Sequence, residues 1–261
     1  MRPLGFLKAD RLVDLLNWVG TPIAFLYMVC MFAAPWFQGS WDWGYVQNVW
    51  DRWQSLNVGM LAFISSLVAF NIAKFNADKQ REREFAAAKA FLPAALSELI
   101  TYFKESASVF QSGWGAQPGT RPDFVRPTLP VGYKDIFAKC IQHAESDVGD
   151  YLARILMRMQ IHDARLRTYI GEGNEGYQFT PQKHNLIPYF YRLAELNALV
   201  SKVFNFARGL DAFDTSDLEW EDFRNAFGNL DVWADEIEVE NVGTLTAFTQ
   251  RAILRNASQE I

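Results

Sequence analysis

Cysteine and histidine are scarce in this sequence of 261 residues, which holds two cysteines and three histidines. Cys30 lies in an apolar run and Cys140 in a helical pattern, far apart along the chain. Two such residues predict neither a disulfide framework nor a zinc site. Sparing use of cysteine is typical of a protein whose soluble part occupies a reducing compartment.

Enzyme motifs are lacking as well. The chain contains no Gly-x-Ser-x-Gly elbow, Walker loop, dinucleotide fingerprint, His-Glu-x-x-His helix or kinase-type loop. So few histidines and cysteines also leave few candidates for a pair of nucleophile and base. We therefore expect a protein that is not an enzyme and that carries no cofactor and no metal.

Positive charge is not in excess. The 25 Lys and Arg residues are outnumbered by 30 Asp and Glu residues, which gives a net charge of −5. Binding to a nucleic acid backbone requires a basic surface. The composition therefore argues against a nucleic acid partner.

Long uncharged runs are what the sequence does contain. Between Arg52 and Lys74 lie 21 uncharged residues, which as a helix would be roughly 31 Å long, close to the thickness of the hydrocarbon core of a bilayer. This run predicts a membrane span over residues 54–74. An uncharged run nearer the N-terminus predicts a span over about residues 12–37. We expect an N-terminal hairpin of two transmembrane helices, residues 1–75.

A secretory signal peptide is the rival interpretation of the first run. Its apolar core would cover only about 7–15 residues before a cleavage site of small residues. The run here is much longer, and its pair of small residues, Ala33 and Ala34, is followed by Pro35. We interpret the segment as a retained span.

The distribution of Lys and Arg predicts the orientation of the hairpin. Three basic residues precede the first span and five follow the second, whereas the connecting segment 38–53 contains only Arg52. Basic flanks stay on the cytoplasmic side. We expect a protein of the inner membrane, with both termini cytoplasmic and an external loop over 38–53.

Tryptophan is concentrated in and beside this loop. Indole rings favour the level of the lipid headgroups, where the ring is apolar and the N–H finds a partner. We interpret these side chains as interfacial anchors, with a platform for an aromatic ligand as the alternative. The residues are Trp36, Trp41, Trp43, Trp50 and Trp53.

Small residues recur along the second span at intervals of four and three. Between helices in lipid, association depends on close approach of the backbones, which small side chains permit. The pattern predicts a packing seam, although small residues are also common by chance in membrane helices. The seam consists of Ser55, Gly59, Ala62, Ser66, Ala69 and Ala73.

The remainder of the chain, residues 76–261, reads as a cytoplasmic bundle of amphipathic helices. Its first helix continues directly from the second span, with a bend expected at Pro93. Segment 113–132 contains four prolines and predicts a loop. Residues 134–170 keep a helical rhythm and predict one long helix. The predicted fold class is all-α.

His162 lies in the apolar seam of that long helix. Because imidazole titrates near neutral pH, it is a candidate for pH sensing, for contact with a partner or for metal ligation. A core or rim histidine bonded to a neighbouring carboxylate is the commoner arrangement.

These features favour a membrane-anchored scaffold, whose helical bundle binds protein partners or a second copy of itself. The alternative is a signal-responsive effector, whose spans oligomerise to permeabilise or gate the bilayer, as in bacterial defence. The expected partners are the lipid bilayer and a protein. No motif identifies a small-molecule ligand.

Overall fold

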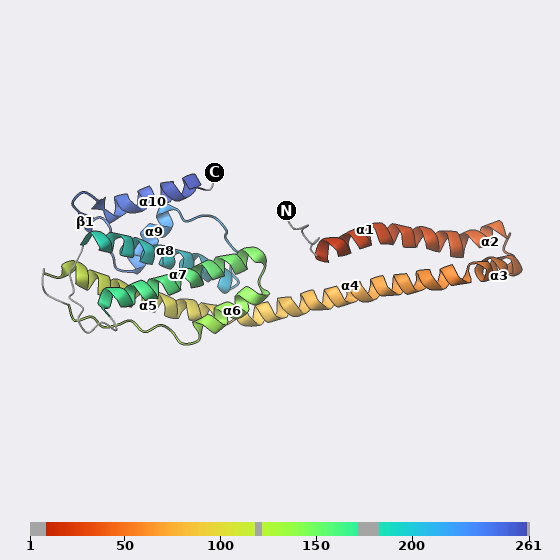
Figure 1. Ribbon diagram of the computed structural model, residues 1–261, viewed down its shortest axis with the longest axis horizontal. Helices are drawn as coiled ribbons and strands as arrows, with labels where there is room; N and C mark the ends of the chain where they lie inside the picture. The colour runs from red at the N-terminus through yellow and green to blue at the C-terminus, as the bar shows by residue number, and fades with distance from the viewer. Residues whose placement is uncertain (1–8, 118–121, 172–182, 260–261) are drawn as a thin grey trace, which may run out of the picture. The chain divides into compact units, whose positions relative to one another are not determined.

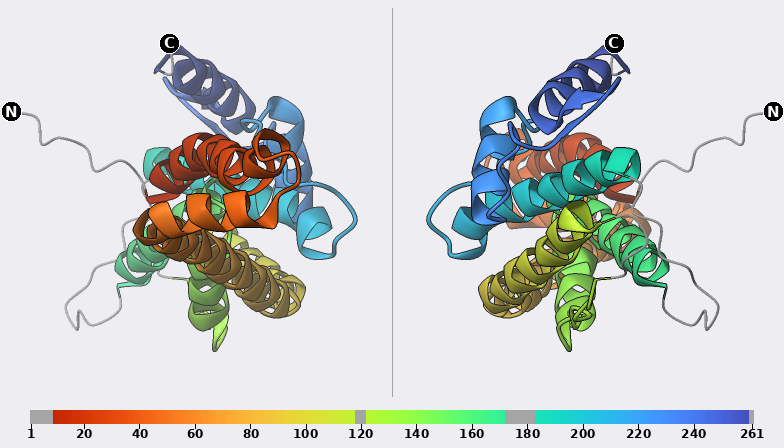
Figure 2. Two further views of the ribbon diagram at one scale, coloured as in Figure 1. Left: turned by 90° about the vertical axis from the view of Figure 1, so that its right-hand side faces the viewer. Right: turned by 90° about the vertical axis from the view of Figure 1, so that its left-hand side faces the viewer.

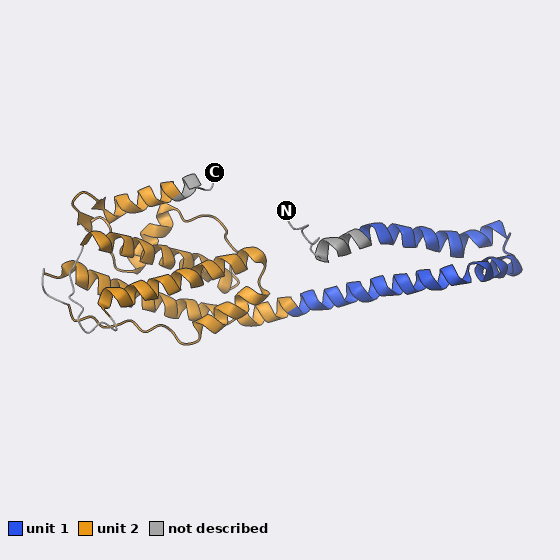
Figure 3. Ribbon diagram, in the orientation of Figure 1, with its two compact units in different colours: residues 1–80 blue, residues 81–261 orange. Residues whose placement is uncertain are grey.

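The computed structural model describes residues 9–117, 122–171 and 183–259, and the side chains of 17–117, 122–171 and 183–255. The described chain is mostly helical, with a single pair of very short strands (Figure 1). The predicted all-α class is confirmed. The chain divides into two compact units, residues 1–80 and 81–261 (Figure 3), close to the predicted boundary at 75.

Unit 1 begins with helix α1 (Ala9–Met28), which contains Pro22. A wider π-helical turn, η1 (Val29–Ala33), joins it to the short helix α2 (Ala34–Gln38), where Pro35 occupies the first turn. Proline is tolerated there because the first N–H groups of a helix have no partner within it.

Helix α3 (Trp43–Arg52) lies within segment 38–53, which we expect to connect the two spans outside the membrane. Asp42 starts the helix, because its carboxylate accepts hydrogen bonds from the backbone N–H groups of Gly44 and Tyr45, at 3.2 and 3.1 Å. An acidic N-cap of this kind satisfies the free donors of the first turn.

Helix α4 (Gln54–Lys89) is a single helix of 36 residues that passes from unit 1 into unit 2. Two stretches of the described chain, Asn17–Gln38 and the one that starts at Gln54, are long and apolar enough to cross a membrane. In the second, none of the most apolar window is buried within the chain. Length and composition therefore agree with two spans.

In unit 2, α4 is followed after Ala90 and Phe91 by α5 (Leu92–Gly115), with Pro93 in its first turn. The expected bend is thus a short break. Next come α6 (Tyr133–His143), α7 (Ser146–Ile170), α8 (Lys183–Ala207) and α9 (Trp220–Asn229). The antiparallel strands β1 (Glu238–Val239) and β2 (Gly243–Thr244) precede α10 (Leu245–Gln259).

The single helix predicted over 134–170 is wrong, because the structure divides it into α6 and α7. Ala144 and Glu145 adopt extended backbone conformations between the two helices. The turn packs α6 against α7 and buries Phe137 and Cys140, which a straight helix would carry away from the core. Burial of these two side chains favours the turn.

Helix α8 is the centre of unit 2. It contacts α5 and α7 as well as α9 and α10, and Figure 2 shows these helices around it. Most of its residues from Leu186 to Val203 are buried, and fully buried aromatic and aliphatic side chains of α5 and α7 pack against them. Because α8 is almost surrounded, any polar side chain in its interior requires a partner.

Candidate functional site

The structure brings four of the five predicted interfacial tryptophans into one cluster in unit 1. The ring of Trp36 lies 5.8 Å from Trp41 and 5.7 Å from Trp43, and Trp43 lies 5.9 Å from Trp50. Trp53 follows α3, and among the described ring contacts it makes none. Trp41, Trp43 and Trp53 are exposed, as an interfacial anchor requires.

Trp50 has an additional structural role. Pro35 has no N–H, so it cannot donate the α-helical hydrogen bond to the carbonyl of Met31, four residues earlier. The indole N–H of Trp50 donates to that carbonyl at 2.9 Å. This indole therefore satisfies a backbone acceptor that would be costly to leave unpaired in lipid.

Polar side chains join α1 and α4. The side-chain amides of Asn17 and Asn71 donate to each other's oxygens, at 2.8 and 2.9 Å, and the Tyr27 hydroxyl donates to Asn57. Asn57 and Asn71 belong to a half-buried stripe of α4 with Met60, Ile64 and Leu67. This stripe is the side of α4 that faces α1.

The predicted small-residue seam lies on the other side of α4. At 3.6 residues per turn its centre is roughly 160° around the helix from the stripe that faces α1. Ser55, Gly59, Ala62, Ser66, Ala69 and Ala73 are all exposed. A Cβ added at Gly59 would meet no atom within 4 Å. The seam therefore does not hold the hairpin together, and its role in association with another helix stays a prediction.

His162 on α7 is buried in an aromatic cluster, with only 6% of its surface exposed. The rings of Tyr102, Phe103 and Phe110 from α5 meet it edge to face, at centroid distances of 5.8, 6.4 and 6.1 Å. Burial lowers the pKa of the imidazole to about 4, because charging it would require desolvation. At neutral pH the ring is therefore uncharged, and the predicted sensing of pH would take place only under acidic conditions.

We expected His162 to bond to a neighbouring carboxylate. The adjacent carboxylate, that of Asp163, is bonded to two other side chains. Asp163 accepts a hydrogen bond from the Tyr102 hydroxyl at 3.2 Å and pairs with Arg167 at 2.8 Å. The His162 Nε2 is buried, and within the described part of the chain it has no hydrogen-bond partner. Buried polar atoms are seldom left without a hydrogen-bond partner.

His162 lines a cavity of about 210 Å³ between α7 and α8, which we call the arginine pocket. Helix α7 also contributes Met157, Arg158, Ile161 and Arg165. Helix α8 contributes Tyr189, Arg192, Glu195 and Leu196. The lining thus combines apolar and aromatic side chains with three arginines and one glutamate.

Glu195 organises the charges of the arginine pocket. Its side chain lies inside the apolar interior of α8, and the residue is only 3% exposed. One carboxylate oxygen pairs with Arg158, and the other with Arg192 at 2.8 Å. A buried carboxylate is tolerated only with such partners, so Glu195 holds both arginines at the wall of the pocket.

Sequence analysis missed Glu195, although a signal for it exists. The stretch Leu193–Val200 is apolar apart from Glu195 and Asn197. A single acid in the buried part of a helix indicates a partner on a neighbouring helix. The partner itself was not identifiable, because Arg158 lies 37 positions earlier on another helix.

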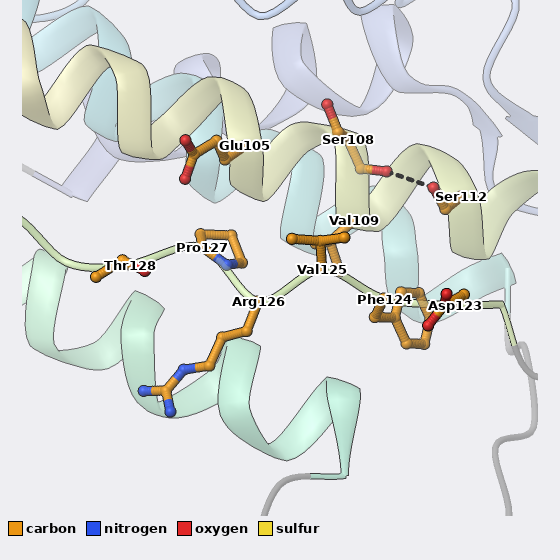
Figure 4. Close-up of a pocket in the computed structure, with 10 residues that line it drawn as sticks. All are labelled: Glu105, Ser108, Val109, Ser112, Asp123, Phe124, Val125, Arg126, Pro127 and Thr128. Atoms are coloured by element: carbon orange, nitrogen blue, oxygen red, sulfur yellow. Dashed lines mark hydrogen bonds between the residues drawn. The ribbon is translucent and has the colours of Figure 1, made fainter.

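A second, more open hollow lies between α5 and the segment that follows it. It measures about 420 Å³ and is lined by Glu105, Ser108, Val109 and Ser112 of α5 and by 123–128 (Figure 4). An adjoining hollow extends along the same segment to Val131. We call the two together the linker groove. In Figure 4 the Arg126 side chain points away from α5.

Among the described residues, no group of three or more His, Cys, Asp or Glu side chains is placed to hold a metal ion. Comparisons of the chain with protein-family models, with curated proteins and with solved structures found no match. The function is therefore argued from the two units themselves.

Proposed function

We propose that this chain is a membrane-anchored helical protein that presents unit 2 to protein partners in the cytoplasm. One observation carries the proposal: in the described structure no residue in the most apolar window of α4 is buried, and the same helix then continues into charged residues up to Lys89. Lipid is the environment that covers such side chains without loss of stability.

The proposed orientation places α3 and its tryptophans outside and both termini inside. Lys74, Lys79, Arg81 and Arg83 follow the apolar part of α4, whereas Arg52 is the basic residue between the two spans. Cytoplasmic flanks are the ones enriched in Lys and Arg. The exposed indoles of Trp41 and Trp43 support a position of this segment at the opposite headgroup layer.

The linker groove is the surface that we assign to a protein partner. Val125 is 83% exposed and Val131 is 95% exposed, in a segment that runs beside α5. Large apolar side chains grouped at an exposed groove are typical of interaction sites. Ser108 and Ser112 supply polar groups along its α5 side.

Topology reporters test the anchoring. A reporter fused at Gly44 and another after Ile261 should report opposite sides of the membrane, and both on one side would contradict the hairpin.

A photo-reactive amino acid in place of Val131 tests the linker groove, and it should capture the same protein in repeated preparations. The same group at Thr168, an exposed position of α7, is the matched control and should capture nothing specific.

The exposed small-residue seam favours a second candidate, an effector whose spans oligomerise to permeabilise the membrane. A seam that faces away from α1 is available to a helix of another copy. Induced expression should then depolarise the membrane, and the paired changes Ala62→Leu and Ser66→Leu should abolish this effect. Val68→Leu, on an exposed part of α4 outside the seam, should leave the effect in place. An unchanged potential with the original chain would exclude this candidate.

A further inference from the structure

The arginine pocket is lined by more positively charged side chains than its one carboxylate can neutralise. Three arginines against one glutamate leave an excess of two positive charges in a chain whose net charge is −5. Like charges gathered at one site repel each other unless an anion lies between them. The pocket therefore favours a ligand with two negative charges.

The geometry of Glu195 leaves hydrogen-bond donors for such a ligand. One of its oxygens accepts a hydrogen bond from Arg192, and the other forms an ion pair with one nitrogen of Arg158. A guanidinium has five N–H groups in a planar fork, so both arginines keep donors beyond this contact. The Arg192 side chain is 51% exposed, and its remaining donors can therefore be reached from solvent. Planar forks of this kind suit the oxygens of a phosphate.

His162 lines the pocket with part of its ring, whereas its Nε2 is buried away from solvent. Its Nε2 is without a hydrogen-bond partner among the described residues, although His162 is 6% exposed. A neutral imidazole can donate a proton from this nitrogen to an oxygen atom. Because this nitrogen is closed off in the structure, the anion site is carried by the three arginines and not by His162.

The apolar lining residues and the volume define the body of the ligand. Met157, Ile161, Tyr189 and Leu196 are apolar or aromatic. The cavity of about 210 Å³ is smaller than the pockets of about 300–1,000 Å³ that hold drug-sized ligands. It therefore accommodates an anionic group with a small planar or aliphatic body.

We propose that the arginine pocket binds a small organic phosphate monoester, with the phosphate against Arg158, Arg165 and Arg192 and the apolar body against Ile161 and Tyr189. This site is distinct from the linker groove and from the apolar helices. The proposal does not depend on the membrane role of the chain.

Phenyl phosphate is the probe, titrated by calorimetry into the full-length chain in an uncharged detergent. Inorganic phosphate carries the charge without the body, and phenol carries the body without the charge. We expect phenyl phosphate to bind about tenfold more tightly than either, because the arginines and the apolar lining residues both contribute. Binding no tighter than that of inorganic phosphate, or no measurable heat at millimolar concentration, would overturn the proposal.

Arg165→Gln is the test variant, because Arg165 is exposed and lines the pocket but does not pair with Glu195. Loss of a charge-assisted bond should weaken the binding of phenyl phosphate by about tenfold or more. Arg154→Gln makes the same change of charge on α7 outside the pocket and should have little effect. Equal weakening by both variants would overturn the proposal.

Ile161→Asp gives a second, independent measurement at an exposed wall of the pocket. The added negative charge should repel the phosphate and abolish binding, while the far-ultraviolet circular dichroism without ligand stays unchanged. Retention of full affinity by this variant would place the phosphate elsewhere and refute the assignment.

Discussion

His162 should make the stability of unit 2 depend on pH in a window that can be calculated. The folded chain holds this imidazole at a pKa of about 4, whereas in the unfolded chain it returns to about 6.5. Between these values the unfolded state binds a proton that the folded state does not. Stability from this residue is therefore complete above pH 6.5 and is lost as the pH falls toward 4.

The magnitude follows from the two pKa values. A tenfold change in a protonation equilibrium is worth about 1.4 kcal/mol, so the full loss below pH 4 is about 3 kcal/mol, and about 2 kcal/mol of it is lost between pH 7 and pH 5. Asp214 does not contribute in that interval. Its pKa is lowered to about 2 by hydrogen bonds from Ser216 and Lys202, so its stabilising effect is lost only at lower pH.

The assay is urea unfolding of the full-length chain in detergent at pH 7 and pH 5, followed by circular dichroism. His162→Leu replaces the imidazole with an apolar group of similar volume, and we expect it to remove about 2 kcal/mol of the dependence on pH. His184→Gln removes an exposed histidine and should retain the dependence. An equal loss of stability on acidification in the original chain and in His162→Leu would refute the reasoning.

Three further substitutions test other contacts. Glu195→Ala should lower the free energy of unfolding by about 1–3 kcal/mol in urea titrations, because the partly exposed Arg158 and Arg192 lose their shared carboxylate; a loss below about 0.5 kcal/mol would contradict this. Gly113→Ala should lower it by about 1–3 kcal/mol, since the new Cβ would lie 1.7 Å from a tyrosine hydroxyl of α7, whereas Gly115→Ala meets nothing within 4 Å and should not. Asn71→Leu and Asn17→Leu should show a coupling of about 1 kcal/mol in a double-mutant cycle, read from tryptophan fluorescence in micelles, and strictly additive effects would argue against their mutual hydrogen bonds.

The local patterns of the sequence predict the apolar segments and several of the helices. Periodicity predicts α5, α7 and α8 because burial of one helical face requires apolar residues at intervals of three and four. It did not predict the break between α6 and α7, since Ala144 and Glu145 are compatible with a helix and only the core around Phe137 favours the turn. Helix α3 depends on a cap at Asp42 that the many aromatic residues around it obscured.

The sequence by itself determined the class of fold, the two apolar stretches and the bias of Lys and Arg around them, because each is a property of neighbouring residues. Only the tertiary structure decided which face of α4 meets α1, and it placed the small-residue seam on the opposite side. Only the tertiary structure brought Arg158 of α7 to Glu195 of α8 beside His162. A buried carboxylate needs a cation close to it in space, and the fold decides which one lies there. The two residues are 37 positions apart along the chain, so local sequence patterns do not relate them.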